Sequence, residues 1–159
     1  MLKKVLPLLF VLTGCASGEL FVYNQEGKTV GHCTSGFDWH PYGVQASTDW
    51  ILHYCAQIAL AACKEKHQGE CTTSLPELVA RDFSLPVPPQ GEQWHKINAR
   101  SAFFANEITE TQYGYILAKI ENDHTLAYQK AEADLAAGHL STSEYEAKLR
   151  AADLAFNGK

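Results

Sequence analysis

The strongest helical pattern in the chain lies at residues 47–67, where apolar side chains recur every three or four positions. That spacing places them on one face of an α-helix. Ser47 is a candidate N-cap, and Asp49 suits the positive end of the helix dipole. The apolar stripe consists of Trp50, Ile51, Tyr54, Cys55, Ile58, Ala59, Ala62 and Cys63. The pattern therefore predicts an amphipathic helix with one buried face.

A second pattern precedes this helix, where residues 20–23 and 28–32 flank the sequence NQEG. Two short β-prone stretches around a turn are typical of a β-hairpin, and Gly27 suits a positive φ. Two strands alone are marginally stable in water, so the hairpin needs a partner such as the helix. A loop rich in aromatic residues, TSGFDWHPYGVQ, joins the hairpin to the helix.

Two further signals follow the helix. The sequence SLPELVARDF predicts a short helix, with Ser74 and Glu77 as a capping box. Residues 84–91 are rich in proline, which favours an extended linker. This linker separates a half that contains cysteines from a half that contains none.

The second half contains an internal repeat, in which residues 99–121 resemble residues 131–153 at a constant offset of 32 positions. In each unit a helix ends at a residue that tolerates a left-handed backbone, Asn106 or Gly138. A hydroxyl residue then caps the next helix, with Gln or Glu three positions later. These capping pairs are Thr109 with Gln112 and Ser141 with Glu144. The repeat predicts three antiparallel helices, at residues 92–106, 110–137 and 142–156.

The middle helix of this array would be about 42 Å long. Its neighbours are shorter, so each covers only one end of it. Several apolar residues would then stay partly exposed within this half, namely Ile116, Ile120, Ala127 and Ala131. We expect the cysteine-containing half, a second copy or a partner protein to cover them.

The N-terminus carries a different kind of signal. Two lysines precede an apolar run, VLPLLFVL, far shorter than the roughly 20 residues of a membrane-spanning helix. The run leads into Leu12, Thr13, Gly14 and Cys15. This arrangement resembles the signal peptide and lipobox of bacterial lipoproteins. The resemblance implies that residues 1–14 are cleaved and that Cys15 is acylated, so that its acyl chains (lipid such as palmitate) anchor the protein in a membrane.

The residue after Cys15 is Ala16 rather than Asp. This resembles the enterobacterial lipoproteins sorted to the outer membrane, and it implies an anchor in the inner leaflet, facing the periplasm. The predicted regions are a signal peptide (1–14), a disulfide-containing region (15–83), a linker (84–91) and a helical repeat region (92–159). The expected fold class is mainly α with a small N-terminal β-hairpin. It combines a disulfide-bonded α+β N-terminal half with an antiparallel helical-hairpin C-terminal half.

Removal of residues 1–14 would leave 145 residues and, because two lysines are lost, would change the formal charge from −5 to −7. That length suits one domain with a modest core, or two small ones. An acidic chain without a basic stripe has no electrostatic reason to bind nucleic acid. We therefore expect no nucleic-acid partner.

Four cysteines remain besides Cys15, and an even number in an exported chain indicates disulfides. They are Cys33, Cys55, Cys63 and Cys71. Cys55 and Cys63 lie roughly 12 Å apart along one helix, beyond the Cα distance of about 7 Å that a disulfide spans. Cys71 can fold back onto Cys63, but it follows too closely to reach Cys55. The predicted bonds are Cys33–Cys55 and Cys63–Cys71. A zinc site is the rival, but no Cys-x-x-Cys spacing supports it.

The second repeat unit, GHLSTSEYEAKL, resembles the SHOCT-like short C-terminal domain, a helical hairpin. His139 replaces an aliphatic residue of that pattern, and Tyr145 replaces its phenylalanine. The resemblance implies a role in assembly. The alternative is that the motif only marks the turn of a helical hairpin.

Two Glu-x-x-His pairs are the candidate metal ligands, and they are Glu92 with His95 and Glu121 with His124. Facing pairs of this kind resemble the ligand set of di-iron carboxylate bundles. Such a site needs two further helices that each supply a glutamate, and no good candidates exist here. His124 also falls on an apolar stripe, which suits a core residue. We therefore predict neither a metal nor another cofactor.

A second group of polar residues surrounds the first predicted disulfide, and its members are His32, Asp38, His40, Asp49 and His53. If that bond forms, His32 and His53 approach each other and could form a metal site or an acid–base pair. The neighbouring aromatic loop offers a candidate ligand surface made of Phe37, Trp39, His40 and Tyr42. The alternative is a small disulfide-bound core with polar edges.

We expect a lipid-anchored cell-envelope lipoprotein with a structural or protein-interaction role, exercised through a protein partner or self-association. The alternative is a small periplasmic binding protein, or an inhibitor or immunity-type protein, that presents the aromatic loop. A metal-binding enzyme is the third possibility. The sequence contains no nucleophile elbow, phosphate-binding loop or zincin motif, so we assign no catalytic residue.

Overall fold

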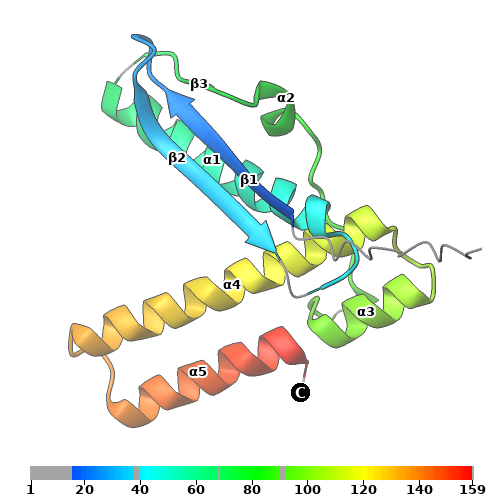
Figure 1. Cartoon of the computed structure of the whole chain (residues 1–159). Helices are drawn as coiled ribbons and strands as arrows, with labels where there is room; N and C mark the ends of the chain where they lie inside the picture. The colour runs from blue at the N-terminus through cyan, green and yellow to red at the C-terminus, as the bar shows by residue number, and fades with distance from the viewer. Residues whose placement is uncertain (1–15, 38–39, 68, 90–91, 159) are drawn as a thin grey trace, which may run out of the picture.

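A computed structural model describes residues 16–37, 40–67, 69–89 and 92–158. The chain is mainly helical, with a small antiparallel sheet and two disulfides in its N-terminal half and helices in its C-terminal half (Figure 1). The predicted fold class is therefore confirmed.

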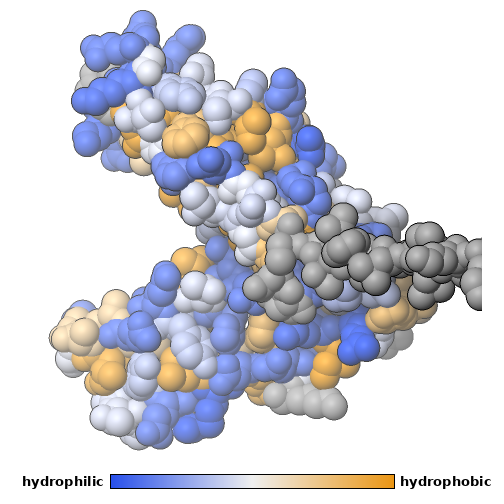
Figure 2. Space-filling model, viewed as in Figure 1, coloured by the Kyte–Doolittle hydropathy of each residue, from blue (hydrophilic) through white to orange (hydrophobic). Residues whose placement is uncertain are grey.

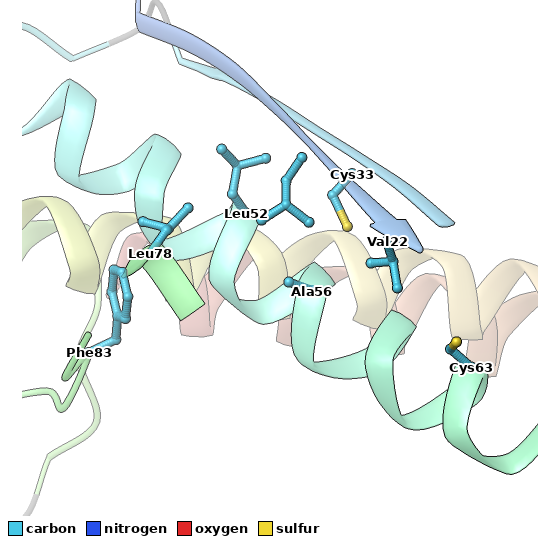
Figure 3. Close-up of a cluster of buried hydrophobic side chains, with 8 residues drawn as sticks. Val22, Cys33, Leu52, Ala56, Cys63, Leu78 and Phe83 are labelled. Carbon is cyan, nitrogen blue, oxygen red and sulfur yellow. The ribbon is translucent and has the colours of Figure 1, made fainter. Parts of the chain in front are cut away.

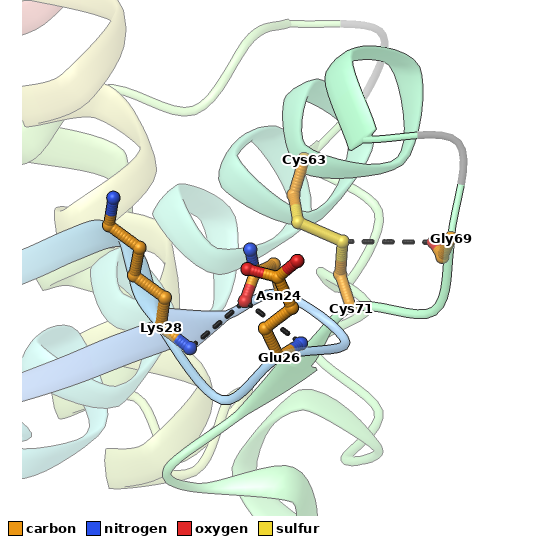
Figure 4. Close-up of a disulfide and its surroundings, with 6 residues drawn as sticks. All are labelled: Asn24, Glu26, Lys28, Cys63, Gly69 and Cys71. Carbon is orange, nitrogen blue, oxygen red and sulfur yellow. Dashed lines mark hydrogen bonds between the residues drawn. A yellow bond between two sulfur atoms is a disulfide. The ribbon is translucent and has the colours of Figure 1, made fainter.

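The predicted hairpin is present, but its strands are longer than the sequence indicated. β1 (Ala16–Tyr23) pairs antiparallel with β2 (Thr29–Phe37). The side-chain carbonyl of Asn24 accepts hydrogen bonds from the backbone N–H groups of Glu26 and Lys28, at 3.1 and 2.9 Å. Gly27 has the expected positive φ, 74°. The turn is thus held by a local side chain as well as by the strands (Figure 4).

A third strand, β3 (Thr72–Thr73), was not predicted, and it places β1 in the centre of the sheet. Ser74 extends this pairing, because its backbone N–H donates to Phe21 O at 2.9 Å and its hydroxyl accepts from Phe21 N at 3.0 Å. The predicted capping box of Ser74 and Glu77 is therefore wrong. The short helix α2 (Pro76–Val79) begins after Leu75, which makes no side-chain capping bond.

Helix α1 (Val44–His67) covers the inner face of the sheet. Leu20 and Val22 of β1 are fully buried against it, and Figure 3 shows the strand side chains directed at Leu52 and Ala56. Alternation along a strand puts every second side chain on that face. Leu78 of α2 and Phe83 complete this core.

Both disulfides lie in this part of the fold. Cys33 of β2 is bonded to Cys55 of α1 with a Cα–Cα distance of 5.9 Å. Cys63 near the end of α1 is bonded to Cys71 with a distance of 6.3 Å, next to the hairpin turn (Figure 4). These are the pairs that the helix geometry selects. The first attaches the sheet to α1, and the second attaches the last part of α1 to the residue before β3.

The C-terminal half consists of α3 (Lys96–Phe104), α4 (Glu110–Ala136) and α5 (Thr142–Asn157). Both predicted capping boxes are present, at the N-termini of α4 and α5. Asn106 and Gly138 have the expected positive φ, 59° and 73°.

Helix α3 begins four residues later than predicted. Its N-cap is His95, whose ring Nδ1 accepts from the backbone N–H of Asn98 at 3.3 Å. The preceding Trp94 donates its indole N–H to Pro86 O at 2.8 Å. Residues 92–94 therefore continue the linker instead of starting the helix.

Two glycines form a close contact between the halves. Gly43, with φ of 68°, precedes α1 and lies against Gly114 of α4. A Cβ on Gly114 would lie 2.3 Å from Gly43 O and 2.8 Å from Ala46 Cβ. Ser47 lies inside α1, and its hydroxyl donates to Gly114 O of α4 at 2.7 Å. The predicted N-cap role of Ser47 is therefore wrong. Small residues let the two helices approach closely here.

The long helix α4 is covered by several parts of the chain. Ile116, Ile120 and Ala131 are 0%, 6% and 1% exposed, whereas Ala127 remains exposed. The first half of α4 is covered by α1 and α3, and its second half lies beside α5 (Figure 1). The cover comes from within the chain, from α3 and α5 as well as from the disulfide-bonded half.

We expect Gly114→Ala to lower the free energy of unfolding by about 1–3 kcal/mol, because its methyl group overpacks a backbone contact. Gly36→Ala is the matched control, since a Cβ there would meet only ordinary contacts at 3.7 and 3.8 Å. Urea denaturation of both variants measures the difference. Equal stability of the two variants would show that α1 and α4 can separate without loss.

Candidate functional site

A cleft of about 600 Å³ lies between the segment after β2 and the exposed side of α3, with side chains of α4 in its floor. This volume falls in the range of small-ligand sites, about 300–1,000 Å³. Its lining residues are His40, Pro41, Tyr42, Lys96, Ile97, Arg100, Phe104, Tyr113, Leu117 and Asn157. Segments far apart in the sequence thus form one surface.

His40 is a buried residue that holds one wall of the cleft in place. Its side chain is buried, and its Nδ1–H donates to Tyr42 O at 2.7 Å, since a carbonyl can only accept. Its Nε2 lies 3.3 Å from the hydroxyl of Ser47 on α1. Burial lowers the pKa of His40, and the charge of Lys96 acts in the same direction. The neutral ring therefore holds the loop against α1.

Aromatic rings form the apolar part of the cleft. Tyr42 lies 5.2 Å from Phe103 and 6.0 Å from Phe104, measured between ring centroids, and Phe103 stacks on Tyr113 at 4.7 Å. Three large apolar residues are exposed here, which we call the cleft patch: Tyr42 (41%), Ile97 (40%) and Phe104 (57%). Buried rings thus support an exposed apolar rim.

Two cations lie on the same surface, one helical turn apart on α3. The Arg100 guanidinium lies 5.6 Å from the centroid of Phe104, and the Lys96 ammonium lies 4.8 Å from that of Phe156. Burial raises the pKa of Tyr113, and the charge of Arg100 opposes that rise. Positive charge therefore reaches the cleft of a chain whose formal net charge is −5.

The predicted ligand surface is only partly present. Phe37 and His40 are 7% and 5% exposed, so they belong to the core rather than to a platform. Tyr42 is exposed and lines the cleft, whereas Trp39 lies outside the described residues. The sequence reasoning missed the α3 side of the site, which comes from more than fifty positions later. The paired aromatic residues of ARSAFF were the available signal.

The candidate metal ligands do not form the predicted facing pairs. His95 caps α3, and its Nε2 lies 3.9 Å from Glu92. His124 instead contacts Asp153 of α5 at 2.9 Å, and the structure gives Glu121 no contact with His95. Within the described residues no group of three or more His, Cys, Asp or Glu side chains is arranged to hold a metal ion.

His32 and His53 do not come together either. Cys33 faces α1, so strand alternation directs His32 to the opposite face of the sheet. There it stacks on Phe21 at 4.4 Å and lies 3.1 Å from Glu19. His53 packs against Phe83 at 4.4 Å. The expected acid–base pair is absent from this region.

The predicted lipidation site, Cys15, lies outside the described residues. No helix in the described part of the chain is both long and apolar enough to span a bilayer. Comparison with models of known protein families found no match, and neither did comparison with curated proteins or with solved structures.

We expect His40 to make stability depend on pH. Its pKa is lower in the folded chain than in the unfolded chain, so the unfolded state binds more protons as the pH falls below about 6.5. Stability should therefore fall with acidification between pH 7.5 and 5.5. Urea midpoints across this range should fall more for the wild type than for His40→Gln. Parallel curves would contradict this role.

Proposed function

We propose that the protein is a lipid-anchored cell-envelope lipoprotein, held through Cys15 in the inner leaflet of the outer membrane, and that it acts by binding another protein. The single observation that carries the binding role is an arm formed by the second half of α4 and by α5. The arm extends from the body of the fold (Figure 1).

The proposed anchor is supported by the lipobox-like sequence before Cys15. Two disulfides suit an oxidising compartment such as the periplasm. A lipid anchor on a helical assembly module would hold the bound partner at the membrane surface.

The arm is well ordered by contacts between its two helices. His124 of α4 and Tyr128 one turn later both donate to the carboxylate of Asp153 on α5, at 2.9 and 2.7 Å. These two bonds lower the pKa of Asp153, so the carboxylate stays ionised and retains both donors. His124 also stacks on Phe156 at 4.6 Å. The histidine therefore joins the helices of the arm.

Most side chains of the arm are not buried by the rest of the protein. After Ile120, the only fully buried residue of α4 is Ala131. Each helix exposes a leucine, Leu126 at 45% and Leu154 at 54%. Figure 2 shows the apolar residues of this face as separate patches between hydrophilic ones. A two-helix arm with exposed leucines is suited to pack against a helix of a partner or of a second copy.

We expect the double variant Leu126→Glu, Leu154→Glu to abolish partner binding, because charges would replace the exposed apolar contacts. A photoreactive amino acid at position 127, beside the arm's exposed surface, should give one dominant crosslinked species in cells. Mass spectrometry then separates a partner protein from a second copy. Val87→Glu is the control, since Val87 is 89% exposed but lies in the linker. A crosslink that survives in the double variant, or none in the wild type, would refute the role.

We expect Cys15→Ser to release the protein from the membrane, because the thiol that carries the acyl chain is lost. Detergent-phase partitioning and the mass of the mature N-terminal peptide measure the anchor. The control variant Cys63→Ser, Cys71→Ser removes cysteines without touching the anchor, and it should still enter the detergent phase. Normal partitioning of Cys15→Ser would contradict acylation.

A further inference from the structure

We infer that the cleft patch, with Lys96 and Arg100, docks onto anionic phospholipids of the membrane that holds Cys15. This inference rests on the proposed lipid anchor. It assigns a role to a cleft that combines exposed aromatic rings with two basic side chains.

The folded body begins very close to the proposed anchor. β1 begins at Ala16, so a single peptide unit of about 3.8 Å separates the folded body from the acylated residue. A body without a spacer must lie against the bilayer, and the residues around Ala16 must face it.

Ala16 and the cleft lie at the same end of the molecule. Ala16 pairs with Phe37, and it packs beside Val44 at the start of α1. Tyr42 of the cleft patch is only two residues before Val44, which is at most about 7 Å of chain. Figure 1 shows the start of β1 beside the segment that joins β2 to α1, far from the hairpin turn.

The side chains of the cleft suit a lipid surface. Aromatic side chains favour the interface between headgroups and acyl chains, and basic side chains favour anionic headgroups. Tyr42 and Phe104 supply the rings, Ile97 adds an aliphatic side chain, and Lys96 and Arg100 supply the charge.

The charge of the remaining surface makes this orientation selective. The full chain has a formal charge of −5, and cleavage of the signal peptide would remove two lysines. The mature chain would therefore carry a formal charge of −7. An anionic bilayer repels such a body, except where its positive charge is concentrated. The carboxylate of Glu110 also lies near this region, where it accepts from Gly43 N at 2.9 Å. The protein therefore presents the cations of α3 to the lipid, while the carboxylate of Glu110 is held by the Gly43 backbone.

The test uses the full acylated protein with a photoreactive amino acid at Phe104, reconstituted in vesicles of phosphatidylethanolamine and phosphatidylglycerol. The matched control carries it at Ile58, because the two residues are 57% and 55% exposed. Ile58 lies about 21 Å along α1 from Val44. Flotation of each sample reports the anchor, and mass spectrometry reports adducts with lipid.

We expect lipid adducts mainly at position 104. The double variant Lys96→Gln, Arg100→Gln should reduce the yield of lipid adducts by about fivefold for each charge removed. Replacement of phosphatidylglycerol by phosphatidylcholine should also reduce the yield. Circular dichroism checks that the variant is folded. Floating vesicles with equal adducts at both positions, or protein adducts at position 104, would overturn the docking while leaving the anchor intact. Failure of the acylated chain to float would overturn both.

Discussion

The contact of Gly43 with Gly114 determines how the two halves of this chain meet. Because neither residue has a side chain, the start of α1 lies directly on the backbone of α4, and Ser47 can donate to a carbonyl that larger residues would cover. This approach packs Ala118 of α4 against Phe37 and Val44. It also positions the segment before α1 opposite α3, which creates the cleft. One close backbone contact thus sets both the junction between the halves and the candidate docking surface.

Features with a local cause were visible in the sequence. The capping boxes at Thr109 and Ser141 involve residues three positions apart, and the turn at Gly138 needs one left-handed residue. The disulfide pairs followed from the rise of a single helix. The cleft has no local signature, because Tyr42 and Phe104 become neighbours only after α1 meets α4.

The errors share a physical cause, which is competition for a side chain by a distant partner. Ser74 could cap a helix, but it pairs with β1 instead. Ser47 could begin a helix, but it donates to α4. A polar side chain can form only a few hydrogen bonds, and proximity in the sequence alone does not determine its partners.

The order of the disulfides has a consequence for how they form. The four cysteines pair consecutively, Cys33 with Cys55 and then Cys63 with Cys71. A chain that emerges N-terminus first could therefore be oxidised correctly by joining each new thiol to the last free one, without later reshuffling. Cys15 is the single thiol that would disturb this sequence, because it emerges before Cys33. Acylation of Cys15 would remove that competitor, so the lipid would protect the oxidative folding pathway as well as hold the protein in place.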